Sequence, residues 1–158
     1  MHHLLKDELD AVSPEICRRI EIKTEERIIS LYEKYDDYFW KREINNWNPQ
    51  CNIHCLVAAM IMIDDDERRK SFVQKVLKSA NYYISAFAND GGCDEGVLYW
   101  EHSCANFFRI ADFIKQITYG KIDITLEPKV VAMSSFPANM YIGKGRVINY
   151  ADCVSFGL

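Results

Sequence analysis

Residues 90–102 read DGGCDEGVLYWEH, and this stretch separates two long helical patterns. Gly91 and Gly92 end the helix before them, because glycine disfavours helix interiors and is common just past a helix end. Acidic residues follow, and Tyr99 and Trp100 then open the next helix. A tyrosine in this position is a candidate for proton transfer, and the plain alternative is a core aromatic whose hydroxyl finds a partner.

Apolar residues recur at helical spacing on both sides of this stretch. The helix before it is expected over residues 64–88, with an acidic start and an apolar stripe along residues 72–87 that faces inward. Basic residues on this helix, such as Lys75 and Lys78, are expected to face water. The helix after it is expected over residues 99–119.

Two further helices are expected nearer the N-terminus. Ser13 and Pro14 are typical of an N-cap and a first helical position, and they predict a helix that runs to about residue 35. The second helix is expected over residues 50–63, where apolar residues occupy nearly every side. Such a helix is expected to be buried all round.

The chain of 158 residues is long enough for one domain with a single core. We therefore expect a single, mainly α domain over residues 1–158, built from stacked α/α hairpins. Its helical part is expected over residues 13–120. Residues 121–158 are expected to form a short helix or loop and then a β-hairpin with strands at residues 139–142 and 146–150.

Charge and hydropathy limit the possible partners. A net charge of −4 and a pI near 5.6 argue against a broad nucleic-acid-binding surface. The longest apolar run, residues 56–63, is too short to span a membrane, and the N-terminus lacks a charged-then-apolar signal pattern. The six cysteines do not have the spacing of a disulfide scaffold. These features favour a cytoplasmic protein with no nucleic-acid or membrane partner.

Asparagines gather before the second buried helix, at Asn45, Asn46, Asn48 and Asn52. A neutral amide can hydrogen-bond a ligand carboxylate without the cost of burying a cation. The alternative is that these asparagines only form turns and helix caps. Trp47 lies among them, and an indole can stack on a sugar ring.

Other site chemistries have less support. Glu95 and Glu101 would suit a glycosidase pair only if they lay a fixed distance apart, and caps or salt bridges are the alternative. Cysteine and histidine gather in two segments, but the spacing differs from that of structural zinc sites. We therefore expect free cysteines, no metal and no cofactor; the residues concerned are Cys51, His54 and Cys55, and Cys93, His102 and Cys104.

Two motifs together resemble the heparinase II/III-like family of polysaccharide lyases. They are NNWNPQCN at residues 45–52 and DGGCDEGVLYWEH at residues 90–102. Residues 31–40 resemble the helix of that family that runs into its cleft, and residues 133–152 resemble the segment that leads to its β-region. The resemblance covers nearly the whole chain.

The resemblance implies part of an incomplete α/α toroid, followed in the family by β-sandwich domains. It implies β-elimination at a uronic acid, in which the C5 carboxylate is neutralised, a base removes the C5 proton and an acid protonates the departing O4. Asn45 and Asn46 would lie by the carboxylate, and Tyr99 would be the acid and also a candidate base. The remaining implied substrate contacts are Trp47 and Trp100, which would flank the sugar, and Glu95, His102 and Arg42.

The chain departs from the family pattern in two ways. Some members carry a histidine where this chain has Asn46 and Trp47, and members draw a further histidine from a region beyond Leu158. We therefore expect weak or absent turnover, and self-association to cover the open edge of a partial toroid. The competing interpretation is a non-enzymatic helical scaffold or an oligosaccharide-binding or interaction module.

Overall fold

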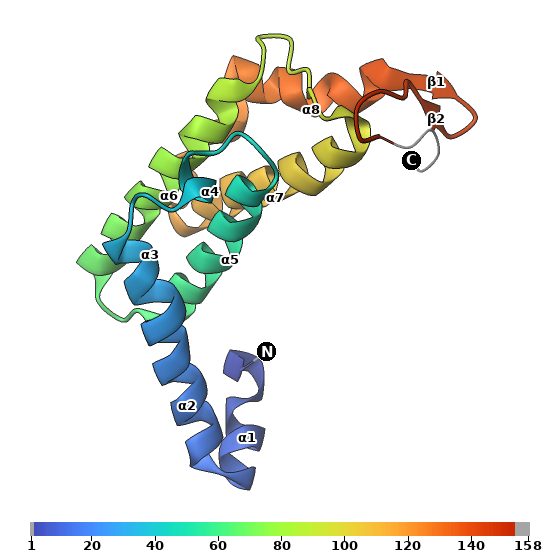
Figure 1. The fold of residues 1–158 in the computed structure, drawn as a ribbon. Helices are drawn as coiled ribbons and strands as arrows, with labels where there is room; N and C mark the ends of the chain where they lie inside the picture. Colours follow the sequence, from blue (N-terminus) through green and yellow to red (C-terminus); the bar gives the residue numbers. More distant parts are fainter. Residues whose placement is uncertain (1, 154–158) are drawn as a thin grey trace.

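The computed structural model describes residues 2–153 and is mainly helical (Figure 1). The N-terminal elements are a 3-10 turn (His2–Leu5), α1 (Lys6–Val12), α2 (Pro14–Thr24), a π-helical segment (Glu25–Ile29), α3 (Ser30–Lys34) and α4 (Phe39–Arg42). The later elements are α5 (Trp47–Met62), α6 (Asp66–Ala86), α7 (Gly96–Ile117), a 3-10 turn (Ile124–Leu126), α8 (Pro128–Met140), and the antiparallel strands β1 (Tyr141–Gly143) and β2 (Arg146–Val147).

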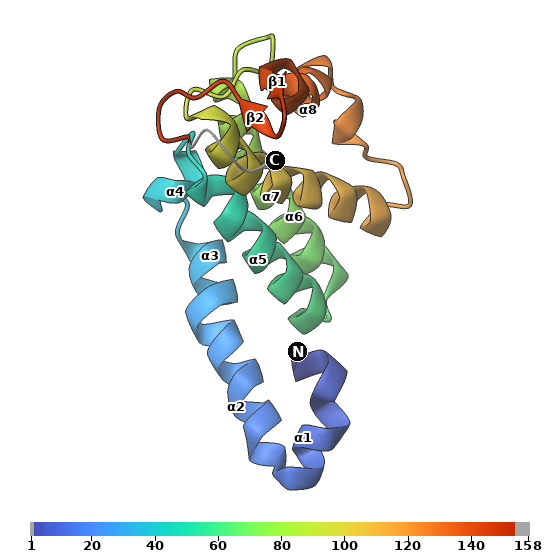
Figure 2. The same ribbon diagram turned by 90° about the vertical axis from the view of Figure 1, so that its right-hand side faces the viewer.

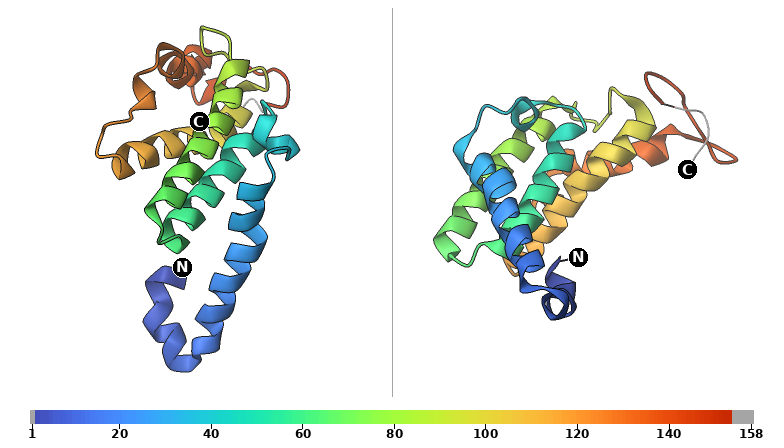
Figure 3. Two further views of the ribbon diagram at one scale, coloured as in Figure 1. Left: turned by 90° about the vertical axis from the view of Figure 1, so that its left-hand side faces the viewer. Right: turned by 60° about the horizontal axis from the view of Figure 1, so that its bottom comes forward.

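Helix α5 lies at the centre, with α6 and α7 both packed against it. The continuous helix from α2 to α3 extends away from this group, and α1 folds back beside α2 at its far end (Figures 2 and 3). Helix α8 and the β-hairpin lie at the opposite end of the molecule, against α7 (Figure 1). The long axis therefore runs from the α1–α2 arm to the hairpin.

Two groups of buried side chains hold the helices together. One lies between the α3 end of the long helix, α5, α6 and α7, and it includes Tyr32, Leu56, Phe72 and Ile110. The other joins the end of α6 to α7, α8 and the hairpin; it consists of Ala80, Tyr83, Phe87, Cys93, Val97, Cys104, Phe107, Val130, Met133, Phe136, Val147 and Cys153. The stretch at residues 90–102 belongs to this second core.

Sequence predicted several helix starts. Ser13 is the N-cap of α2 with Pro14 at the first position, which confirms the predicted start. The acidic start of α6 is also confirmed, because the Asp65 carboxylate accepts a hydrogen bond from the backbone N–H of Arg68 at 2.7 Å. This bond satisfies one of the amides that a helix start leaves without an internal partner.

Other boundaries differ from the prediction. Helix α5 begins three residues earlier, at Trp47, and it is not buried all round, because His54 and Ile61 are exposed. Helix α1 lies outside the predicted helical range 13–120, and α7 begins at Gly96, three residues before Tyr99. Helix α8 stands where a short helix or loop was expected after residue 120. In α8, Pro128 starts the helix and apolar side chains are buried at intervals of three residues, at Val130, Met133 and Phe136.

The β-hairpin is confirmed near its predicted place, with shorter strands. Residues 154–158 of the predicted C-terminal region lie outside the described residues. Among the helices of residues 2–153, none combines the length and apolar character needed to cross a membrane.

Candidate functional site

The asparagine segment has an inner and an outer half. Asn48 is completely buried, and its amide donates hydrogen bonds to the backbone carbonyls of Lys41 at 3.2 Å and Ser79 at 3.1 Å. Asn52, one turn later on α5, donates to the Ser79 hydroxyl at 2.8 Å and accepts from the Tyr32 hydroxyl at 2.6 Å. Buried amides need such partners, and these two connect the start of α5 to α4 and α6.

Asn45 and Asn46 lie on the outer half of the segment and are half-buried. The Asn45 carboxamide oxygen accepts a hydrogen bond from the backbone N–H of Trp47 at 3.1 Å, which forms the turn into α5. Asn46 is the N-cap of α5, without a side-chain capping bond. Asn45 and Asn46 therefore form the turn into α5 and also keep side-chain surface that a ligand can reach.

The stretch between α6 and α7 requires glycine at two positions. Gly91 and Gly96 have φ angles of +77° and +85°, in the left-handed region that favours glycine. A Cβ at Gly91 would lie 2.3 Å from the backbone of Ala132 on α8, and a Cβ at Gly96 would lie 2.7 Å from the Cβ of Cys153. The DGGCDEG motif is therefore explained in part by close packing against α8 and the C-terminal segment.

Trp100 packs toward α8. Its indole N–H donates a hydrogen bond to the backbone carbonyl of Met133 at 2.8 Å. Pro137 lies four residues after Met133 within α8 and has no N–H, so the helix itself leaves this carbonyl without its usual partner. The Trp100 ring also lies against the second core. The predicted role of Trp100 beside a sugar remains a prediction, and this contact gives the residue a structural role.

A cavity of about 210 Å³ brings the two sequence motifs together. Asn45 lines it from the turn before α5, and Glu95 lines it from the N-cap of α7. The other lining residues are Ile44, Tyr83, Ala86, Phe87, Gly92, Cys93, Asp94 and Ser103. Its volume lies below the roughly 300–1,000 Å³ of drug-sized sites, so it suits a ligand no larger than about one sugar unit.

The cavity is lined by acidic and neutral side chains. Burial raises the pKa of Glu95, and the nearby carboxylate of Asp152 raises it further. Glu95 therefore holds its proton to higher pH than an ordinary glutamate. The Tyr83 hydroxyl donates to the Ser103 hydroxyl at 2.7 Å, and burial raises the pKa of Tyr83, so this phenol stays neutral. Among the residues of the described range 2–153 that line the cavity, none is a cation.

Tyr99 lies on the same face of α7 as the cavity-lining residues. Glu95, Tyr99 and Ser103 follow one another at intervals of four residues, and Ser103 donates to the Tyr99 carbonyl at 2.6 Å. The Tyr99 ring is half-buried and meets the exposed His102 ring edge-on, with 6.2 Å between the ring centres. Within residues 2–153, the Tyr99 hydroxyl has no hydrogen-bond partner, so it is available to a ligand.

The remaining predicted residues lie apart from the cavity. Trp47 is 52% exposed at the start of α5, and Arg42 lines a separate hollow between α4 and α6. Lys75, expected to face water, is half-buried and donates to the Glu33 carbonyl at 2.8 Å and to the Asp36 carboxylate at 3.0 Å. The segment after α3 covers this part of α6. The spacing of apolar residues in α6 does not predict that contact.

Sequence reasoning did not identify Asp94 and Ser103 as site residues. Ser103 lies eight residues after Glu95, and helical spacing from Glu95 would have selected it. No disulfide and no group of three or more metal-ligating side chains is found within residues 2–153. Neither models of known protein families nor curated proteins match the chain.

Proposed function

We propose that this chain is a carbohydrate-active domain similar to the heparinase II/III-type lyases, part of an incomplete α/α toroid, that acts on a uronic-acid-containing polysaccharide. A uronate unit enters the cavity between Asn45 and Glu95. The Asn45 amide, with Asn46 beside it, hydrogen-bonds the C5 carboxylate and so stabilises the negative charge that develops when C5 loses its proton.

Tyr99 protonates the leaving oxygen in this proposal. Tyr99 starts as the phenolate and takes the C5 proton. The C4–C5 double bond then forms, the C4–O4 bond breaks with its electron pair on O4, and the phenol so formed returns the proton to O4, so Tyr99 is both base and acid. The His102 ring lies edge-on to the phenol, with 6.2 Å between the ring centres.

One observation carries the proposal. Asn45 and Glu95 lie fifty residues apart in sequence and line the same cavity; Tyr99, which does not line it, follows Glu95 by one turn of α7. Other motif residues have structural roles: the amides of Asn48 and Asn52 are buried in hydrogen bonds, and the Trp100 indole is bonded to α8. These contacts favour the alternative, a helical scaffold or binding module.

The test is an elimination assay on several uronate polymers, followed by the ultraviolet absorbance of the unsaturated product. We expect weak activity that falls by roughly 100-fold or more in Tyr99→Phe, because general acid–base catalysis typically contributes about 10²–10⁴-fold. Tyr119→Phe is the matched control, since Tyr119 is fully exposed and distant in sequence from the cavity residues.

Binding separates the two interpretations. Polymer that binds the wild type without product, and more weakly to Asn45→Ala, supports the oligosaccharide-binding module. Absence of both product and binding for every uronate polymer tested contradicts the proposed function.

A further inference from the structure

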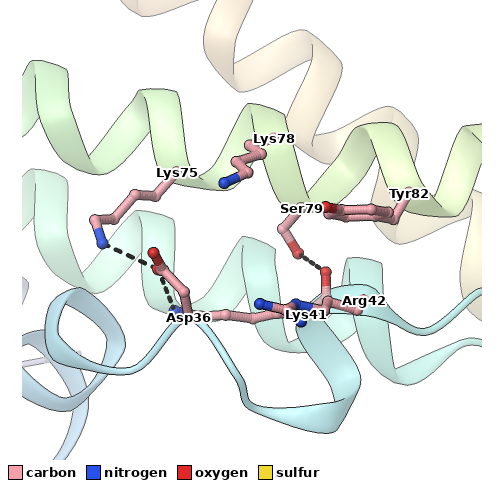
Figure 4. Close-up of a pocket in the computed structure, with 7 residues that line it drawn as sticks. All are labelled: Asp36, Lys41, Arg42, Lys75, Lys78, Ser79 and Tyr82. Carbon is pink, nitrogen blue, oxygen red and sulfur yellow. Dashed lines mark hydrogen bonds and ion pairs between the residues drawn. The ribbon is translucent and has the colours of Figure 1, made fainter.

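A second hollow lies between α4 and α6, next to the cavity, and basic side chains dominate it (Figure 4). Lys41, Arg42, Lys75 and Lys78 line it, with Asp36 as the acidic member. Four cations against one carboxylate stand out in a chain whose formal net charge is −4. We call this hollow the basic pocket.

One lining residue of this pocket, Lys41, has a buried ammonium group. Lys41 is only 4% exposed, and its amine donates to the backbone carbonyls of Tyr32 and Tyr35 and lies 3.8 Å from the centre of the Tyr32 ring. Its nearest carboxylate oxygen, on Asp36, is 3.8 Å away. Buried charges are normally paired closely, because removing an ion from water is costly. The burial lowers the pKa of Lys41.

Asp36 does not neutralise the pocket. Its carboxylate accepts a hydrogen bond from Lys75 at 3.0 Å, which lowers the pKa of Asp36, so one negative charge is shared by two lysines. Figure 4 shows the Lys78 amine directed into the space between α6 and the segment that carries Lys41. Within residues 2–153, Lys78 and Arg42 form no ion pair. The pocket therefore has positive charge left for a ligand.

We propose that the basic pocket binds one small oxyanion group, held by Lys78 and Arg42 over the buried charge of Lys41. Its volume of about 30 Å³ admits a group of roughly one or two water volumes but no sugar ring. Tyr82 also lines it, and the next residue, Tyr83, lines the cavity. Both hollows therefore border the same stretch of α6, at residues 75–82 and 83–87.

This proximity suggests the source of the anion, and this step rests on the proposed function. With a uronate in the cavity, a charged group on an adjoining sugar reaches the basic pocket. That group is a sulfate ester or a second carboxylate, and both offer oxygens to Lys78 and Arg42. None of the described residues that line the cavity is a cation, so the basic pocket supplies the attraction for an acidic polymer.

The first experiment titrates the protein with inorganic sulfate at low ionic strength and follows backbone amide shifts by NMR. We expect saturable shifts centred on residues 78–79, weakened roughly three- to tenfold in Lys78→Gln and in Arg42→Gln. Lys70→Gln is the control, because Lys70 is exposed on the same helix, does not line the pocket among residues 2–153 and pairs with Glu67 at 3.5 Å. The proposed anion site is contradicted if sulfate binding weakens equally in all three variants, or if the amide shifts do not saturate.

The second experiment measures binding of sulfated and unsulfated uronate oligosaccharides. A loss in Lys78→Gln confined to the sulfated ligands assigns a sulfate ester, and an equal loss for both assigns a carboxylate. If Lys78→Gln binds all of them as the wild type does, the pocket is not a polysaccharide subsite. If the pocket binds sulfate but the protein binds none of the oligosaccharides, the anion site is supported and the proposed function is contradicted.

Discussion

Single residues of the recognisable motifs have distinct physical roles. Trp100 occupies its place because Pro137 leaves the Met133 carbonyl without a helical donor, and the indole N–H fills that gap from 33 residues away. Asn48 fills a comparable gap at the carbonyls of Lys41 and Ser79. Both side chains are used for folding, whereas the Asn45 amide lines the cavity and the Tyr99 ring is half-buried.

Trp100→Phe should destabilise the fold by roughly 1–3 kcal/mol, because it leaves the Met133 carbonyl without its donor. The free energy of unfolding from urea denaturation measures this. Trp47→Phe, at an exposed position, should change it by less than about 0.5 kcal/mol.

A double-mutant cycle tests the reason for this loss. Pro137→Ala restores an N–H four residues after Met133, so Trp100→Phe should cost less in that background than in the wild type. An equal cost in both backgrounds would show that the tryptophan acts through its volume alone.

At the scale of elements, the link from α6 to α7 is shaped by what packs on it. Gly91→Ala should destabilise the protein well beyond the roughly 1–2 kcal/mol of left-handed strain, because its Cβ would overlap the backbone of α8. Gly120→Ala is the matched control: Gly120 has the same φ of +77° and open space around its Cβ position. Chemical denaturation of both variants gives the comparison, and similar losses would exclude the contact with α8 as the cause.

The elements that sequence predicted well are those set by local rules. The period of apolar residues predicts α6 and α7, and capping chemistry predicts a helix start at Ser13 and another in the acidic run of residues 64–67, where Asp65 is the cap. These rules relate residues that are only a few positions apart in the chain, so they can be applied to the sequence without knowledge of the fold.

The candidate site depends on contacts between distant segments, and sequence predicted it less completely. Neighbouring asparagines have the same local preferences, and the tertiary contacts with Lys41 and with Ser79, 31 residues later, select Asn48 for the interior. The spacing of apolar residues in α6 predicts that Lys75 faces water, yet the chain around Asp36 covers it. Asn45 and Glu95 were predicted as site residues, but their shared cavity required the fold.

At the scale of the whole molecule, apolar side chains remain exposed at the end formed by the hairpin. Ile142 on β1 is 64% exposed, and Tyr141 and Ile148 beside it are also exposed. A two-stranded sheet also leaves strand edges with unpaired backbone groups, which favour pairing with another chain. These features give the sequence-based expectation of self-association a specific location.

We therefore expect a homodimer or larger assembly at micromolar concentration, with a mass by light scattering of at least twice 18.4 kDa. Ile142→Lys should shift the protein toward monomer, because it places a charge where the hairpins would meet. Leu126→Lys is the control, since Leu126 is 74% exposed in the turn before α8. Dissociation by both variants would place the interface elsewhere, and a wild-type monomer at these concentrations would contradict self-association. Since the edge of a partial toroid must be covered to remain soluble, a stable monomer would also weaken the proposal that the chain forms part of one.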